Sequence, residues 1–321
     1  MSGTVRRMLI VLCLSIAFSA IATAQNTPLF QFKFGGLGPD DGQLSGPRGI
    51  AIQGDEVYIV ELGNDRVSVF DLAGNFLRKF GESGSSAGQF GTAIHVAVAA
   101  DGTSYVTDNA RHTVLKFDPA GNFVLEWGGM GSADSQLNQP QGIAIDGDGD
   151  IWVCDRINTA LKEFDDQGTF LSKVEGGNPM IGLTDVILNT DGSFYLTIWS
   201  GSYTGMRQFD EDGMVIRSVS ASFQAPQGLA QSPNGLLLYV VASGPSNRAW
   251  VVDEMNFIVE DNWGGAGSED DQFSQPWDIA TADNGRIYVA DRSNHFVKVF
   301  EHPVFADDFE TGDTSGWSSM Q

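Results

Sequence analysis

One short motif recurs along the chain at nearly constant spacing, and it constrains the fold more than any other feature. In its clearest copies the motif is Pro-x-Gly-Ile/Leu-Ala, and two degenerate copies fill the gaps. Successive first positions lie 46, 47, 43, 43 and 50 residues apart. Self-similarity at such a period is typical of a repeat architecture, in which each unit buries its apolar face against its neighbours. The chain therefore contains six copies of one unit, which begin at Pro47, Ala93, Pro140, Leu183, Pro226 and Pro276.

Each copy predicts four short strands. In the third copy, strand-like runs cover residues 142–145, 151–154, 161–164 and 170–174, with turn residues between them. The sixth copy ends after its third strand, whereas residues 29–36 resemble the fourth strand of the second copy. Radially repeated antiparallel strands are typical of propeller blades. We therefore expect an all-β six-bladed β-propeller of four-stranded antiparallel blades, closed by an N-terminal strand that completes the last blade.

The two ends of the chain differ from the repeats. Arg6 and Arg7 precede an apolar run, and small residues follow at Ala22 and Ala24, which is the pattern of a secretory signal. We expect residues 1–24 to be a signal peptide, residues 25–303 to form the propeller, and the acidic residues 304–321 to form a disordered tail. The product is then expected outside the cytoplasm, in the periplasm or the extracellular space.

Net charge limits the classes of partner. The chain has 18 Lys and Arg against 41 Asp and Glu, a formal charge of −23. Phosphate backbones and anionic membrane surfaces are bound through basic side chains, so we expect no nucleic-acid partner and no membrane insertion.

Cys154 is the one cysteine beyond the predicted signal, and its strand-like surroundings predict a buried, inert thiol. We expect a monomer.

Acidic residues follow the second strand in four copies, at Glu61, Asp108, Asp155 and Asp291. Short acidic side chains at such positions cap turns by accepting hydrogen bonds from backbone N–H groups. We therefore expect a structural role for all four.

The whole pattern resembles the NHL-repeat family of six-bladed β-propellers, with bacterial secreted members. The second copy carries the likeness in full, with Asp101-Gly102, a strand ending in Asp108, Val114-Leu115-Lys116-Phe117-Asp118, Gly121-Asn122-Phe123 and Trp127-Gly128. The resemblance covers about residues 29 to 303. It implies the fold but does not identify the function, because one fold hosts many functions. RNA-binding members of the family use basic surfaces, which this chain lacks.

A lyase branch of the family, the peptidyl-hydroxyglycine amidating lyases, implies a further test. Those proteins carry zinc-binding His at the second position of several motifs, and none of the second positions here is His. Their catalytic site therefore does not carry over. The same branch has an Asp at the third position that contributes to a calcium site in the channel, and Asp185 and Asp278 match that role.

The third position of the motif alternates around the predicted ring. Gly49, Gly142 and Gly228 occupy it in the odd copies, and His95, Asp185 and Asp278 in the even ones. Alternate blades of a six-fold ring are about 120° apart, so the three polar side chains converge on the channel. One hypothesis is that they bind a divalent cation, and the resemblance to the lyase branch favours calcium. The alternative is that the Asp side chains bond neighbouring backbone N–H groups and His95 is a polar channel residue.

Copies four and five depart from the repeat after their second strands, where aromatic residues and glycines replace the usual turn. Trp199 and Tyr203 lie in the fourth copy and Trp250 in the fifth, while Arg48 and Trp277 occupy second positions of the motif. Irregular loops on a regular scaffold commonly contact ligands. We therefore expect a ligand-binding surface on the channel face that contains Arg48, Trp199, Tyr203 and Trp277, with Trp250 as a further aromatic member.

Three functions remain open from the sequence. The first is a binding or interaction module that recognises a protein, peptide or glycan on its channel face. The second is a metal-dependent lyase or lactonase-like hydrolase, in which His95, Asp185 and Asp278 hold a cation and Arg48 orients an anionic substrate. The third is an envelope scaffold without a small ligand. We rank them in that order and assign no catalytic residue, because no complete catalytic constellation occurs.

Overall fold

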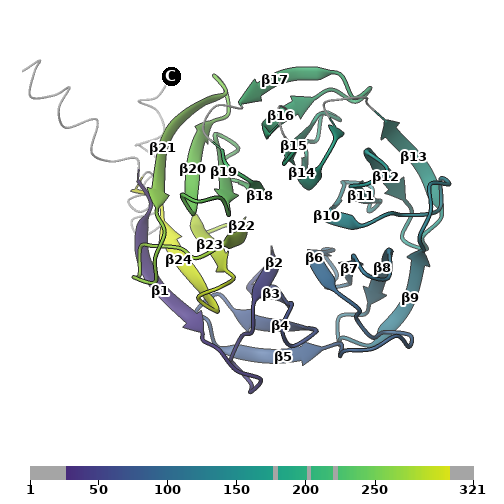
Figure 1. Ribbon diagram of the computed structural model, residues 1–321, viewed down its shortest axis with the longest axis horizontal. Coiled ribbons are helices and arrows are strands. Elements are labelled where there is room, and N and C mark those ends of the chain that lie inside the picture. The colour runs from purple at the N-terminus through teal and green to yellow at the C-terminus, as the bar shows by residue number, and fades with distance from the viewer. Residues whose placement is uncertain (1–26, 176–179, 201–203, 220–222, 304–321) are drawn as a thin grey trace, which may run out of the picture.

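The structure, a computed structural model, describes residues 27–175, 180–200, 204–219 and 223–303, which form six four-stranded antiparallel sheets arranged around one axis (Figure 1). This confirms the predicted six-bladed propeller. The predicted signal peptide, the tail at residues 304–321 and Tyr203 lie outside the described residues. Within the described residues, no helix is long and apolar enough to cross a membrane.

In every blade the motif forms the innermost strand, and the strands follow outward in chain order, except that the outermost strand of the sixth blade is β1 (Figure 1). The strands of blades one to three are β2 (Pro47–Gln53), β3 (Glu56–Glu61), β4 (Arg66–Asp71) and β5 (Phe76–Phe80); β6 (Ala93–Val98), β7 (Ser104–Asp108), β8 (Thr113–Phe117) and β9 (Phe123–Gly128); and β10 (Pro140–Ile145), β11 (Ile151–Asp155), β12 (Ala160–Phe164) and β13 (Phe170–Glu175). Those of blades four to six are β14 (Leu183–Leu188), β15 (Phe194–Ile198), β16 (Gly205–Phe209) and β17 (Val215–Val219); β18 (Pro226–Gln231), β19 (Leu237–Ala242), β20 (Arg248–Asp253) and β21 (Ile258–Gly264); and β22 (Pro276–Thr281), β23 (Arg286–Asp291), β24 (Phe296–Glu301) and β1 (Leu29–Gly35).

The last blade is closed by the N-terminal strand, as predicted. β1 pairs antiparallel with β24, with Phe34 opposite Val297. Phe34 is buried and packs against Phe70 of the first blade, with ring centroids 4.9 Å apart. The strand therefore completes one sheet and also contributes to the core between blades six and one.

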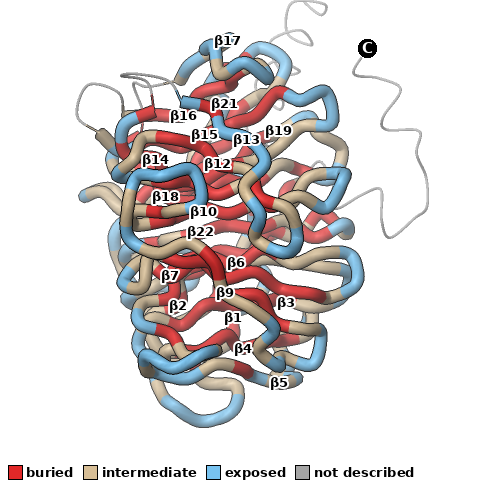
Figure 2. Tube along the Cα trace, turned by 90° about the vertical axis from the view of Figure 1, so that its right-hand side faces the viewer, coloured by how far each residue is buried: buried red, intermediate tan, exposed pale blue. Residues whose placement is uncertain are grey.

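The core lies between neighbouring blades. All residues of β7 and β8 are buried, whereas in the outermost strand β9 Trp127 alone is buried and Val124 is exposed. The inner strands are covered on both faces by adjacent blades, which explains their continuous apolar runs. Figure 2 shows this as a band of buried strands between exposed loops. Cys154 is fully buried here, and burial raises the pKa of its thiol.

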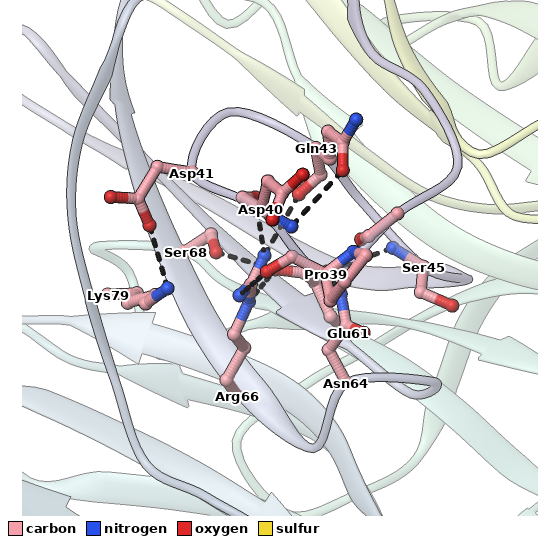
Figure 3. A network of polar contacts seen from close by, with 11 residues as sticks. Pro39, Asp40, Asp41, Gln43, Ser45, Glu61, Asn64, Arg66, Ser68 and Lys79 are labelled. Atoms are coloured by element: carbon pink, nitrogen blue, oxygen red, sulfur yellow. Dashed lines mark hydrogen bonds and ion pairs between the residues drawn. The ribbon is translucent and has the colours of Figure 1, made fainter.

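The acids after the second strands hold the connections between blades. In blade one, Glu61 accepts hydrogen bonds from the Ser45 backbone N–H at 2.9 Å and from Arg66 Nε at 2.6 Å. The Arg66 guanidinium also donates to the Pro39 carbonyl at 2.7 Å, beneath the connecting loop (Figure 3). These contacts show the predicted structural role for Glu61.

Lysines replace the arginine of this cluster in blades three and six. Lys162 Nζ lies 3.1 Å from Asp155 and donates to two backbone carbonyls of the preceding connection. Lys298 Nζ lies 3.1 Å from Asp291 and does the same. Both lysine side chains are almost completely buried.

Candidate functional site

The second positions of the six motifs surround one end of the channel. Together they line a cavity of about 220 Å³, with one side chain contributed by each inner strand. Because the motif recurs at the start of every inner strand, the fold brings together side chains that lie far apart in the sequence. These six residues are Arg48, Ile94, Gln141, Thr184, Gln227 and Trp277.

A larger cavity of about 990 Å³ adjoins the first and shares Trp199 and Trp277 with it. Its lining comes from blades four, five and six, and includes Thr204, Ser243 and Asn247 of the irregular connections. The turn between second and third strands has four residues in the other blades, six in blade four and five in blade five. The connections of blades four and five that depart from the repeat therefore line the larger cavity.

Trp277 organises two arginines between these cavities. The Arg48 guanidinium lies 4.2 Å from the centre of the Trp277 ring and that of Arg292 lies 5.0 Å from it. Burial lowers the pKa of Arg48 to about 10, with a further contribution from the nearby charge of Arg292. Arg48 Nε is buried and has no hydrogen-bond partner among the described residues. The indole ring thus stabilises both cations through its π face.

The predicted ligand-binding residues have different positions in the structure. Trp199 is 46% exposed and lines both cavities, as Trp277 does, whereas Arg48 lines the smaller one. Tyr203 lies outside the described residues. The expectation for Trp250 was wrong: it is 5% exposed and packs edge-on against Phe223, with ring centroids 5.4 Å apart. Its strand, β20, is covered on both faces, so its indole belongs to the core.

Sequence reasoning missed two arginines of the site, Arg156 and Arg292. Each directly follows the acid that ends the second strand of its blade, at the end of the channel where the cavities lie. The acid itself faces the connecting loop, so the next residue is free to line the channel mouth. Attention to the position after Asp155 and Asp291 would have found both.

The third positions of the even blades converge, as predicted. His95 Nε2 lies 2.8 Å from Asp278 Oδ2 and 3.4 Å from Asp185 Oδ1, and all three residues are buried. They line a separate cavity of about 270 Å³, whose other lining is mostly Ile, Val and Ala of the inner strands. One residue step along each inner strand thus separates two cavities of different chemistry.

The two aspartates also tie neighbouring blades together. Asp185 Oδ2 accepts a hydrogen bond from the Leu229 backbone N–H at 2.9 Å, and Asp278 Oδ2 accepts one from the Ile50 N–H at 2.8 Å. In each bond, an aspartate of an even blade accepts from a backbone N–H of the next odd blade. This is the structural alternative considered for these aspartates, and the structure shows it directly.

Buried charges perturb each other in this cluster. Burial, the largest influence, lowers the pKa of His95, but the carboxylates of Asp278 and Asp185 outweigh it and raise that pKa to about 9. Burial raises the pKa of Asp185 to about 7, opposed by His95 and reinforced by Asp278. A protonated imidazole between carboxylates is therefore the favoured state near neutral pH.

The glycines of the odd blades have a steric reason. A Cβ on Gly142 would lie 2.6 Å from Asp185 Cα, and one on Gly228 would lie 2.5 Å from Asp278 Cα. A Cβ on Gly49 would lie 2.6 Å from His95 Cα. Neighbouring inner strands therefore approach too closely for two side chains, and the alternation of Gly with His or Asp follows.

A cation at His95, Asp185 and Asp278 stays a prediction. One ligand atom from each residue lies within 4.8 Å of the others, which suits shared coordination of one ion. The same atoms are already engaged in the ion pairs and backbone hydrogen bonds described above. Arg48 lines the cavity at the other end of the motif, so the structure does not place Arg48 and these three residues in one site.

Comparison with protein families identifies the repeat. Residues 137–164 and 273–300 match the family model of the NHL repeat, in blades three and six. The chain thus contains NHL repeats, which confirms the resemblance inferred from its motifs. A related protein is the RING finger protein nhl-1 of Caenorhabditis elegans, 46% identical over 65 residues. That alignment covers 20% of this chain and 7% of the relative, so the chain spans a small part of that protein.

Solved structures share the architecture at low sequence identity. A streptogramin B lyase has a TM-score of 0.57 and 16% identity, over 84% of this chain and 97% of the lyase chain. Virginiamycin B lyase from Staphylococcus aureus has a TM-score of 0.55 and 15% identity, over 80% and 95%. Hydrazine synthase of Kuenenia stuttgartiensis has a TM-score of 0.60 and 14% identity, over 87% and 83%. At these identities the likeness concerns the fold alone.

Proposed function

We propose that this NHL-repeat propeller is a binding module that takes its ligand in the two joined cavities at the channel mouth. The observation that supports it is the larger cavity of about 990 Å³, lined by connections of blades four and five that depart from the repeat. Ligand sites are typically concave, with aromatic walls and a few polar groups that fix orientation. The cavities have these features, with Trp199 and Trp277 among amides, hydroxyls and arginines.

The proposal includes a location outside the cytoplasm. It rests on the basic start, apolar run and small residues of the first 24 positions. Extended or branched ligands of that environment, such as glycans and peptides, fit a cavity that is open to solvent on one face of the molecule.

The alternative of a metal-dependent lyase or hydrolase has less support. That mechanism needs Arg48 to orient a substrate at a cation held by His95, Asp185 and Asp278. Arg48 lines the cavity of about 220 Å³ at the channel mouth, whereas His95, Asp185 and Asp278 line the separate cavity of about 270 Å³. The names of the lyase neighbours add no weight, because their likeness is one of fold. A scaffold without a ligand has less support as well, since such a role would need no hollow, arginine-lined channel mouth.

Arrays of glycans and peptides, probed with the full-chain protein, test the binding function. We expect specific capture that is lost in Trp199→Ala, because this exposed indole lines both cavities. The matched control is Leu236→Ala, which removes an equally exposed side chain, 46%, from the turn between β18 and β19. Capture that is identical in wild type and Trp199→Ala, or no capture by the wild type, would contradict the proposal.

A further inference from the structure

We infer that the ligand of the channel-mouth cavities is an acidic glycan, whose uronate carboxylate pairs with the arginines at that end of the channel. The inference rests on the proposed binding function and specifies its ligand. It starts from a contrast of charge. The chain carries 41 acids against 18 basic residues, yet the lining of the two cavities contains three arginines and, among the described residues, no acid.

The acids of the described chain do not neutralise the three arginines, Arg48, Arg156 and Arg292, two of which contact the Trp277 ring. Among the described residues, none of their guanidinium groups forms an ion pair or donates a hydrogen bond. Other arginines of the chain pair with acids: Arg78 pairs with Glu56 at 2.5 Å, and Arg111 with Glu126 at 2.7 Å. The part-buried Arg48 keeps a buried Nε donor without a partner, and a bidentate carboxylate would satisfy such a donor.

The acids that directly precede Arg156 and Arg292 in the sequence are not available to pair with them. Asp155, which precedes Arg156, accepts from the Asn138 N–H at 2.7 Å and from Asn158 Nδ2 at 2.7 Å. Asp291, which precedes Arg292, accepts the matching hydrogen bonds from Ser274 and Asn294. Both carboxylates also contact a buried lysine, so their charge is neutralised within the connection. The acids of the outer surface act weakly, because salt screens charges beyond about 8 Å.

The rest of the lining favours a sugar over a peptide chain. Trp199 offers an exposed ring on which the apolar face of a pyranose can stack. Gln224, Ser243 and Gln275 supply side-chain groups that both donate and accept hydrogen bonds, as sugar hydroxyls require. Trp277 fixes the two nearest guanidinium groups, which reduces the entropy lost when a carboxylate binds. The set provides stacking, hydroxyl recognition and carboxylate pairing in one hollow.

Calorimetric titration with matched probes tests this inference on the full-chain protein. Oligogalacturonate is compared with its methyl ester, which keeps the sugar and removes the charge. A short peptide with a free C-terminal carboxylate is compared with its amide. We expect the free-acid glycan to bind at least tenfold more tightly than the ester, and its affinity to fall as salt is raised.

Arginine variants locate the contact. Arg292→Gln is expected to weaken oligogalacturonate binding by roughly tenfold or more, because a charged hydrogen bond is lost. Arg156→Gln tests the smaller cavity in the same way. The matched control is Arg286→Gln, at the opposite end of the same strand, β23, where the guanidinium lies 5.9 Å from the Phe32 ring. Unchanged melting temperatures show that each variant is folded.

The outcomes separate this inference from the proposed function. Equal affinity for acid and ester would overturn the carboxylate contact, while binding in the cavity would still stand. Binding of the peptide acid without the glycan would overturn the glycan assignment. Failure of both glycan forms to bind would overturn the inference, whereas the array result with Trp199→Ala judges the proposed function independently.

Discussion

At the residue scale, the alternation at the third motif position is explained by close approach of inner strands. The sequence showed the alternation but not its cause. A Cβ added to Gly142 would lie only 2.6 Å from Asp185 Cα, and this distance supplies that cause. Side-chain identity at one blade thus depends on the neighbouring blade, a relation that a single repeat read alone does not contain.

Replacing Gly142 by Ala should therefore destabilise the fold. The added methyl group meets backbone of the next blade, and overpacking of this kind costs about 1–3 kcal/mol. Chemical denaturation measures the loss of unfolding free energy. Gly147→Ala is the control in the same blade, because a Cβ there meets nothing within 4 Å. Equal stability of the two variants would contradict the steric account.

Stability should also fall as pH rises across neutrality. The pKa of His95 is raised from 6.5 to about 9, so its contribution is fully present below 6.5 and is lost as pH rises through 9. The pKa of Asp185, raised from 3.8 to about 7, acts in the same direction, because the folded state retains a proton that the unfolded chain releases. The His95 contribution amounts to at most about 3 kcal/mol.

Denaturation of wild type and His95→Gln at pH 5.5, 7 and 9.5, with a chelator present, checks this expectation. The wild type should lose stability relative to the variant between the lowest and the highest pH. Parallel curves for the two proteins would show that His95 does not gain its proton affinity from the aspartates.

At the scale of the element, the positions of the strands could be predicted from the sequence, but the arrangement of side chains at the channel mouth could not. Continuous apolar runs separated by turn residues define β10 to β13 within one or two residues, because burial on both faces demands that pattern. The convergence of Arg48, Arg156 and Arg292 depends on which way each turn directs its side chains. Trp199 and Trp250 illustrate the limit: both are tryptophans of irregular blades, yet one lines the cavities and the other belongs to the core.

The connection between blades should depend on its buried lysine. Lys162→Met leaves Asp155 buried without its cation, a change that typically costs about 3–5 kcal/mol. Unfolding free energy from denaturant titration measures it. Lys79→Met is the control, since Lys79 pairs with Asp41 at the surface and such pairs contribute about 0–1 kcal/mol. A Lys162→Met variant as stable as the control would show that the connection does not need this ion pair.

At the scale of the whole molecule, closure and channel chemistry are the two properties that emerge. Closure could be predicted, because the missing fourth strand of the last blade has its counterpart at the N-terminus. The division of the channel into an arginine-lined end and an apolar end with His95 could not, because it requires the inner strands to be assembled into a ring.

Removal of β1 should open the ring. A chain that begins at Leu37 lacks the partner of β24 and exposes an unpaired strand edge, which favours aggregation. A chain that begins at Thr27 retains the pair and is the control. Size-exclusion chromatography and thermal unfolding distinguish the two, and a monomeric, equally stable short chain would contradict closure by β1.

Elemental analysis of the dialysed protein tests the predicted cation. One equivalent of calcium, lost in a variant with Ala at His95, Asp185 and Asp278, would place the ion at the channel cluster. A melting temperature lowered by chelation would assign it a structural role. The absence of stoichiometric metal would leave the protonated His95 between the two carboxylates as the state of the cluster.

The most direct test of the proposed site, the channel-mouth cavities with an acidic glycan bound, is a crystal structure of the full-chain protein grown with oligogalacturonate. The proposal predicts density for the sugar in the joined cavities, with a ring against Trp199 and a carboxylate within hydrogen-bond distance of Arg292 or Arg48. Ligand density at another surface, with the two cavities filled only by solvent, would contradict it.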